Sequence, residues 1–228
     1  LGRAHALAFA AEGASVVVND LGVSREGTGG DSASASQEVG PASRVVAEIM
    51  AMGGSAGANG ADVADWDGVQ GLIKATKDTY GSVDILCANA GTATFGPVAT
   101  LDPAEEQKQV QLNVLGVHDL VLAVLPGMVE RRAGGILISG SAAGNSPIPN
   151  NATYAATKAF ANTFSESLRG ELKPVGVHVT VLAPGPVRTE LPDPGDQSIV
   201  ERLIPDFLWI DTVYTAKVSL DGLERNKM

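Results

Sequence analysis

The chain has 228 residues, of which 27 are glycine and 32 are alanine, while aromatic residues make up 4% and charged residues 18%. This length suits one domain, since a chain of this size buries about 70% of the surface that it exposes when unfolded. The net charge of −10 argues against a nucleic-acid partner, and no apolar run reaches the roughly 18 residues of a membrane span. The single cysteine rules out an internal disulfide and a cysteine-based metal site, which fits a reducing compartment such as the cytoplasm.

Short apolar runs of strand length alternate with helical segments along the chain. An Ala-rich helix over 1–14 comes first, and strands are expected over 15–20, 55–62, 83–88, 135–139 and 178–182. Helices are expected over 42–52, 65–80, 101–131, 151–173 and 211–226, with a possible kink near Gly116 or Pro126. The strands are apolar throughout, as in a parallel sheet that helices cover on both faces. The pattern predicts one α/β domain over residues 1–228.

Two loops are longer than the usual connections of a compact domain. Residues 21–37 are rich in Gly and Ser and are predicted to form a mobile insertion after the first strand. Residues 189–210 contain prolines and a glycine and then become apolar and aromatic. Loops of this length in compact domains are usually functional lids or disordered connections.

Tyr154 and Lys158 are four residues apart in an expected helix, so their side chains share one face. A phenol with its ordinary pKa of about 10 is a poor base near neutral pH. A nearby ammonium favours the phenolate, and we expect it to bring the pKa of Tyr154 toward neutrality, where proton transfer is most effective. Alone, the pair is only suggestive, and the alternative is an exposed Tyr and an exposed Lys that happen to align.

Other polar residues lie where strands and helices are expected to place them near this pair. Ser141 is 13 residues before Tyr154 and just past the end of a strand, and ligands of open α/β sheets bind beyond such ends. Asn113 is in the middle of an expected helix, where Asn is unfavourable, so its amide either has a role or lies on the surface. Asn89-Ala90-Gly91 closes another strand with a small-residue turn that lets the backbone pass close to a ligand.

In their order along nearly the whole chain, these residues resemble the short-chain dehydrogenase/reductase family. The motifs are Asp20 after a strand, Asp62-Val63, Asn89-Ala-Gly91, Asn113, Ser141, Tyr154 with Lys158, and Pro184-Gly-Pro-Val-Arg-Thr189, the last of which matches Pro-Gly-x-Val-x-Thr. The resemblance implies a Rossmann-type doubly wound parallel sheet with helices on both faces. It also implies hydride transfer between a nicotinamide cofactor and an alcohol or ketone, without a metal.

The resemblance assigns roles to individual residues. Tyr154 would be the general acid and base, Lys158 would tune it and hold the nicotinamide ribose, Ser141 would orient the substrate carbonyl, and Asn113 would hold a water in the proton relay. The residues that would contact the cofactor are Gly2, Asp20, Asp62, Val63, Asn89, Ala90, Gly91, Tyr154, Lys158, Pro184, Gly185, Val187 and Thr189. The loop and helix over 189–210 would cover the substrate, with Leu191, Phe207 and Trp209 as candidate pocket walls, although Phe207 and Trp209 also suit an ordinary core.

Asp20 bears on the choice between the two nicotinamide cofactors. A carboxylate at this strand end accepts hydrogen bonds from ribose hydroxyls and repels a 2′-phosphate, which predicts NAD rather than NADP. The alternative is that Asp20 only shapes a turn, and Arg25 is the nearby cation that could bind a phosphate.

Both ends of the chain depart from the family pattern. Only Leu1-Gly2-Arg3-Ala4 corresponds to the glycine-rich turn Thr-Gly-x-x-x-Gly-x-Gly, which in the family follows the first, central strand. We therefore expect the family's first and last strands to be missing from this chain, and the physical protein to be longer at both ends, because a sheet without its central strand leaves backbone groups unpaired.

The leading hypothesis is an NAD-dependent dehydrogenase or reductase in the cytoplasm that acts on a lipophilic secondary alcohol or ketone, of hydroxyacyl, steroid-like or terpene-like type. One alternative is a dinucleotide-binding sensor or scaffold without turnover, and another is an epimerase or dehydratase of the related extended family. The complete Asn/Ser/Tyr/Lys set and the short length favour the oxidoreductase. Relatives pair helices that correspond to 101–131 and 151–173, so a homodimer or homotetramer is expected, without a nucleic-acid or membrane partner.

Overall fold

The computed structural model describes residues 1–22, 40–188, 205, 206 and 209–227. Nearly all of the predicted mobile insertion over 21–37 and most of the predicted covering segment over 189–210 lie outside these residues.

Parallel strands form the centre of the molecule. β1 (Ser15–Asn19) pairs with β2 (Ser55–Asn59), and β4 (Gly134–Ser139) lies between β3 (Ile85–Ala88) and β5 (Val177–Leu182). A short parallel pair of β6 (Val187–Arg188) and β7 (Ile210–Asp211) follows β5 in the chain. The middle strand β4 is the most deeply buried, with Ile136, Leu137 and Ile138 all 0% exposed.

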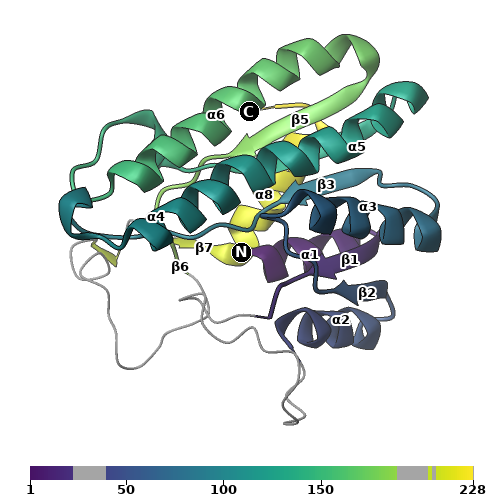
Figure 1. Cartoon of the computed structure of the whole chain (residues 1–228). Coiled ribbons are helices and arrows are strands. Elements are labelled where there is room, and N and C mark those ends of the chain that lie inside the picture. The colour runs from purple at the N-terminus through teal and green to yellow at the C-terminus, as the bar shows by residue number, and fades with distance from the viewer. Residues whose placement is uncertain (23–39, 189–204, 207–208, 228) are drawn as a thin grey trace.

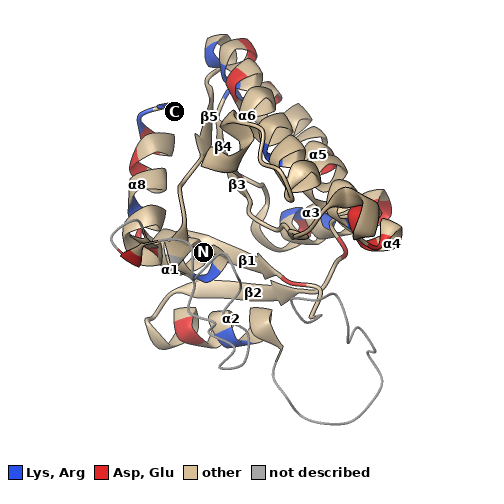
Figure 2. Ribbon diagram, turned by 90° about the vertical axis from the view of Figure 1, so that its left-hand side faces the viewer, with Lys and Arg blue, Asp and Glu red and all other residues tan. Residues whose placement is uncertain are grey.

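Among the described residues, β1–β2 and β3–β4–β5 are separate sheets, and no described strand pairs with the second edge of β1 or of β3 (Figure 2). That the family's first and last strands are missing from this chain stays a prediction. Ile85 in β3 is 43% exposed whereas Leu86 beside it is 8% exposed, because successive strand residues point to opposite faces and Leu86 faces the main core cluster.

Helices cover both faces of these strands (Figures 1 and 2). On one face, α3 (Trp66–Tyr80), α5 (Val117–Arg131) and α6 (Ala152–Leu172) pack in the main core cluster, with Val17 of β1 against it. On the other face, α1 (Gly2–Ala11) and α2 (Pro41–Ala51) pack against Val16 and Val18, and α8 (Thr212–Glu224) packs beside α1. Because successive strand residues point to opposite faces, this alternation confirms the predicted doubly wound α/β fold.

The long helix expected over 101–131 is interrupted. α4 (Pro103–Val110) passes through a π-helical segment, Gln111–Gly116, into α5. A Cβ on Gly116 would lie 2.8 Å from the carbonyl oxygen of Val63, so glycine allows the helix to approach the chain that follows β2. The predicted kink near Gly116 therefore takes the form of a π turn, whereas Pro126 lies inside α5 without ending it.

The helical stretch Pro103–Arg131 is also long and apolar enough, by length and composition alone, to cross a membrane. The sequence contains no uninterrupted apolar run of this length, because Asn113, His118 and Asp119 divide the stretch that follows the polar first turns. In the structure, its inward side belongs to the core of the domain, since Val121, Val124 and Met128 are at most 2% exposed within the main cluster.

Candidate active site and its relatives

The predicted site residues gather where the strands end. Asp20 follows β1, Asp62 follows β2, Asn89 follows β3 and Ser141 follows β4. Because these strands are parallel to their neighbours, their carboxyl ends lie at one edge, where open α/β sheets bind ligands.

Tyr154 and Lys158 lie one turn apart on α6, beside the end of β4. The Nζ atom of Lys158 is 5.7 Å from the centre of the Tyr154 ring and donates a hydrogen bond of 2.8 Å to the carbonyl oxygen of Ser139. The Ser141 side chain lies close enough to Tyr154 to lower the pKa of the phenol. The phenol, the ammonium and the Ser141 hydroxyl therefore lie together in one place, and Lys158 is only 8% exposed.

The pKa values in this cluster are controlled by burial. Burial raises the pKa of Tyr154 above its usual value, and the nearby Ser141 side chain opposes part of that rise. Burial also lowers the pKa of Lys158 to about 8. The direction for Tyr154 is opposite to the predicted shift toward neutrality. The physical reason is that desolvation disfavours the phenolate, while the ammonium of Lys158 is bonded to a backbone carbonyl rather than to the phenol.

Asn113 lies in the π segment and is 2% exposed, so the surface interpretation of this residue is wrong. Its side-chain amide accepts from the backbone N–H of Thr92 at 2.9 Å and donates to the carbonyl of Thr92 at 2.8 Å and to the hydroxyl of Thr157 at 3.1 Å. The amide thus holds the chain that follows Asn89–Gly91 against α6. A role in holding a water of the proton relay stays a prediction.

Glycines bring the backbone of several elements close together at this edge. A Cβ on Gly2 would lie 2.8 Å from Nδ2 of Asn89, and a Cβ on Gly91 would lie 3.1 Å from Oδ1 of Asn113 and 3.6 Å from Nζ of Lys158. The hydroxyl of Ser139 donates to Oδ1 of Asn89 at 3.1 Å, which ties the ends of β3 and β4 together. Ala90 lies between Asn89 and Gly91 in this turn.

These features fit a nicotinamide dinucleotide. The N-terminus of α1, at Gly2, has no side-chain cap and no acidic residue in its first turn, so its N–H groups can bind a pyrophosphate. The carboxylate of Asp20 is exposed at the end of β1 and forms no ion pair with a described residue, so it can accept hydrogen bonds from a ribose.

Asp20 also shapes a turn, because its Oδ1 accepts from the backbone N–H of Gly22 at 2.8 Å. The next strand presents a similar carboxylate, since Oδ1 of Asp62 accepts from the N–H of Ala64 at 2.8 Å and Val63 beside it is buried. The side chain of Asn19 binds both the N–H and the carbonyl of Ala61 at 3.0 Å and holds the two strand ends in register.

The Pro184-Gly-Pro-Val segment is close to the chain that carries Ser141. The carbonyl of Pro184 accepts from the N–H of Ala142 at 2.9 Å, Gly185 is exposed, and Val187 begins β6. Thr189, Leu191 and Phe207 lie outside the described residues. Trp209 directly precedes β7, and its backbone N–H donates to the carbonyl of Asp206 at 3.3 Å. A place for Trp209 in a substrate pocket stays a prediction.

Sequence reasoning missed Asn162, which lies one turn beyond Lys158 on the same face of α6. It is 7% exposed and binds both backbone groups of Ser141. The signal was present in the sequence, because Tyr154, Lys158 and Asn162 are polar residues at four-residue spacing in a helix whose other inward positions are mostly apolar or small.

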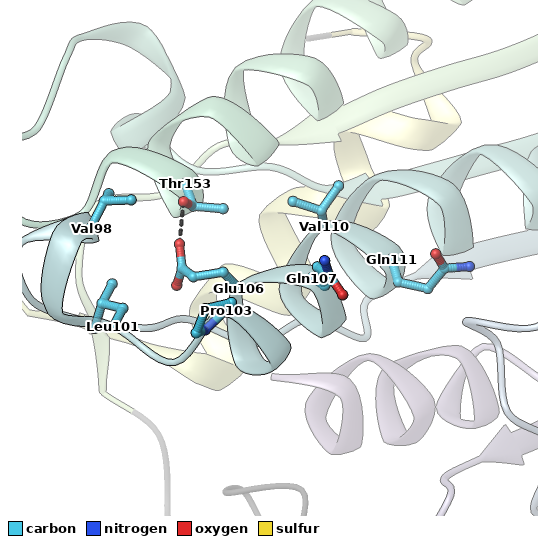
Figure 3. A pocket seen from close by; sticks show the side chains of 8 residues that line it. All are labelled: Val98, Leu101, Pro103, Glu106, Gln107, Val110, Gln111 and Thr153. Atoms are coloured by element: carbon cyan, nitrogen blue, oxygen red, sulfur yellow. Dashed lines mark hydrogen bonds between the residues drawn. The ribbon is translucent and has the colours of Figure 1, made fainter.

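Sequence reasoning also missed a network around Glu106 on α4. The hydroxyls of Thr94 and Thr153 both donate to its carboxylate, and Oε1 of Gln109 accepts from the N–H of Thr94 at 2.6 Å. A cavity of about 620 Å³ adjoins this network and is lined by Val98, Leu101, Pro103, Glu106, Gln107, Val110, Gln111 and Thr153 (Figure 3). None of the predicted catalytic or pocket residues lines this cavity.

Two other kinds of chemistry, metal binding and cysteine reactivity, find no support in the described residues. Across the part of the chain that the structure describes, no cluster of three His, Cys, Asp or Glu side chains could hold a metal ion. Burial raises the pKa of the Cys87 thiol to about 12, which makes this side chain an inert apolar residue of β3.

Known proteins share both the sequence and the fold. The family model described as short chain dehydrogenase matches residues 26–198. A 3-oxoacyl-[acyl-carrier-protein] reductase of Synechocystis sp. is 34% identical over 205 residues, which cover 90% of this chain and 77% of that protein. A short chain dehydrogenase from Mycobacterium avium has a TM-score of 0.70 and 36% identity, over 81% of this chain and 64% of the other. A metagenomic short-chain oxidoreductase crystallised with NADP has a TM-score of 0.73 and 25% identity, over 96% and 83% of the two chains.

The family model and the relatives indicate an oxidoreductase that uses a nicotinamide dinucleotide. With the family model matching residues 26–198, the chain belongs to the short-chain dehydrogenase/reductase family.

Proposed function

We propose that the protein transfers hydride between NAD(H) and a lipophilic secondary alcohol or ketone. The observation that carries the proposal is the convergence of Ser141, Tyr154 and Lys158 beyond the end of β4. The bound nicotinamide would supply the hydride chemistry, and the protein would supply position and a proton.

In this proposal, the phenol of Tyr154 gives its proton to the carbonyl oxygen during reduction and takes it back during oxidation. The hydroxyl of Ser141 donates a hydrogen bond to the same oxygen and orients the carbonyl. Lys158 holds the ribose hydroxyls and stabilises the phenolate through its charge. Asn113 keeps the Thr92 backbone in place against this cluster.

The test uses the full-length protein and the variant Tyr154→Phe, which removes only the phenolic oxygen. We expect kcat/KM to fall by about a thousandfold, within the range for loss of a general acid or base, while binding of the reduced cofactor measured by its fluorescence is unchanged. Full activity in Tyr154→Phe would contradict the mechanism. Cofactor binding without turnover of any alcohol or ketone would instead support the sensor interpretation.

The preference for NAD is part of the proposal and is supported by the exposed carboxylate of Asp20. The metagenomic relative was crystallised with NADP, so a protein of this fold binds the other cofactor. Arg25, the cation that could bind a 2′-phosphate, lies outside the described residues.

For the substrate, we favour a lipophilic compound with a secondary alcohol or ketone, and a 3-oxoacyl thioester is the first to test. The 3-oxoacyl reductase among the relatives and the apolar residues over 203–210 support this choice. A panel of 3-oxoacyl thioesters, steroid ketones, terpene ketones and sugars separates the classes. Turnover of sugars without turnover of lipophilic ketones would contradict the proposal of a lipophilic substrate.

We also propose a homodimer or homotetramer in the cytoplasm. Leu115, Leu122 and Val129 are each at least 38% exposed and recur every seven residues along the π segment and α5, which suits helix pairing between subunits. The cytoplasmic location rests on the single cysteine, which fits a reducing compartment.

A further inference from the structure

The loop that carries Ser141 is attached to α6 by one buried side chain, Asn162. Its Nδ2 donates to the carbonyl of Ser141 at 3.0 Å and to Oδ1 of Asn145 at 3.0 Å, and its Oδ1 accepts from the N–H of Ser141 at 3.4 Å. The amide therefore holds both backbone groups of Ser141, whose side chain lies close enough to Tyr154 to affect the pKa of its phenol.

The residue before Ser141 leaves the space that Asn162 needs. A Cβ on Gly140 would lie 2.2 Å from Oδ1 of Asn162 and 2.7 Å from Cγ2 of Val181, so it would force these side chains out of their places. Gly140 is therefore required by the presence of Asn162, and the two positions act as a matched pair.

The loop lies directly on the helix on its other side as well. A Cβ on Gly144 would lie 2.5 Å from the carbonyl carbon of Lys158, so the short helix η3 (Ala142–Asn145) packs on the backbone of α6. At the start of η3, the hydroxyl oxygen of the capping residue Ser141 accepts from the backbone N–H of Ala143 at 3.1 Å. This bond occupies a lone pair of the hydroxyl and leaves its proton available for the phenol or for a substrate carbonyl.

We propose that Asn162 is a positioning residue that sets the place of the Ser141 hydroxyl relative to Tyr154, with Gly140 as its required neighbour. Asn162 acts through Ser141 and does not itself touch the reacting atoms. The inference rests on the proposed function, because it gives Ser141 and Tyr154 their roles. Catalytic geometry tolerates errors of only about 0.5 Å, so a shift of this loop reduces the rate before it abolishes binding.

The decisive variant is Asn162→Asp, which keeps the size of the side chain but replaces the donor to Ser141 and Asn145 with an oxygen. In full-length protein, we expect kcat to fall by about 10- to 100-fold, while the KM for the cofactor is unchanged. The Ser141 side chain lowers the pKa of Tyr154, so moving Ser141 away from the phenol raises that pKa. The acidic limb of kcat/KM for alcohol oxidation, which needs the phenolate, therefore moves to higher pH.

The matched control is Ser165→Ala, because Ser165 lies on the same helix, is 0% exposed and donates only to the carbonyl of Ala161 in its own helix. Ser165→Ala should keep the kcat and the pH profile of the parent. A second variant, Asn162→Ser, has a side chain too short to reach Ser141 and introduces no charge. It should move the pH profile in the same direction as Asn162→Asp, and it replaces that variant in the test if the aspartate variant does not fold.

The variant Ser141→Ala tests whether Asn162 acts through the hydroxyl of Ser141. It should move the acidic limb in the same direction, and Ser141→Ala combined with Asn162→Asp should move it no further, because both act through one hydroxyl. Parental kcat and pH profile in folded Asn162 variants, or shifts that add in the double variant, would overturn the inference. If Ser141→Ala and Tyr154→Phe themselves keep full activity, the proposed function has failed instead.

Discussion

Asp20 is the residue with the most direct influence on the proposed cofactor preference. Its Oδ1 is occupied by the turn to Gly22, and the second carboxylate oxygen is free of described partners at the end of β1. The negative charge at this point would favour ribose hydroxyls and oppose a phosphate group in the same place.

Replacing Asp20 with Ser should therefore shift the ratio of kcat/KM for NAD to kcat/KM for NADP toward NADP by about tenfold or more. Steady-state kinetics with both cofactors at low ionic strength measures this ratio. Asp67→Ser is the control, because Asp67 is another exposed acid, in the first turn of α3, and should leave the ratio unchanged. Equal efficiency of the parent protein with the two cofactors would refute the preference.

At the scale of elements, one face of α4 and the π segment holds the chain that follows β3. Glu106, Gln109 and Asn113 are spaced three and four residues apart, so they share this face and bind Thr92 and Thr94. Glu106 also accepts from Thr153, the residue before Tyr154, and so links α4 to the start of α6.

Glu106→Ala should lower the free energy of unfolding by about 2 kcal/mol, because two partly buried hydroxyls lose a charged acceptor. The control is Glu105→Ala in the same turn, whose exposed pair with Lys108 should contribute less than about 1 kcal/mol. Urea unfolding of both variants gives the comparison. Equal losses would mean that the Glu106 network contributes no more than a surface ion pair.

At the scale of the whole molecule, a buried hydrogen bond joins α1 near the start of the chain to α8 near its end. Nε2 of His5 is 2.8 Å from Oγ of Ser219, and Ser219 itself donates to the carbonyl of Ala216 at 2.7 Å. Nε2 must then carry the proton, and Nδ1 is a buried acceptor without a partner. A second proton on Nδ1 would have no acceptor, which agrees with burial lowering the pKa of His5 to about 4.

This predicts a dependence of stability on pH. The unfolded chain takes up a proton at His5 near pH 6.5, whereas the folded chain does so only near pH 4. The stability that the neutral ring contributes is therefore complete above about pH 6.5, and it is lost as the pH falls from there to about 4. The variant His5→Gln should flatten this part of the curve in thermal unfolding from pH 4 to 8. An unchanged slope in His5→Gln would assign the pH dependence to other groups.

The proposed assembly gives the second prediction at this scale. Leu122 is 44% exposed on α5, and Leu122→Glu should lower the mass measured by light scattering from that of a dimer or tetramer toward that of a monomer. Val213→Glu on α8 is the control, because Val213 is 65% exposed but lies on the opposite face of the sheet. A parent protein that is already monomeric would refute the proposal.

Local signals explain why so many elements were predictable. Asp65 accepts from Gly68 at the start of α3, and Asp102 with Pro103 starts α4, as capping residues and an N-terminal proline indicate. The catalytic candidates were recognised from their order along the chain. The π turn at Gln111–Gly116 was not, because it depends on how closely the helix approaches Val63, a residue about 50 positions away.

The sequence by itself determined the alternation of strands and helices, the family and the candidates Ser141, Tyr154 and Lys158, since all of these follow from short-range pattern and motif order. Only the tertiary structure decided which polar side chains support them. Asn162 reaches Ser141 across 21 residues, Glu106 joins Thr94 to Thr153, and His5 meets Ser219 across 214 residues. It also reversed the expected pKa shift of Tyr154, because desolvation depends on everything that packs around a group and not on the residue four positions away.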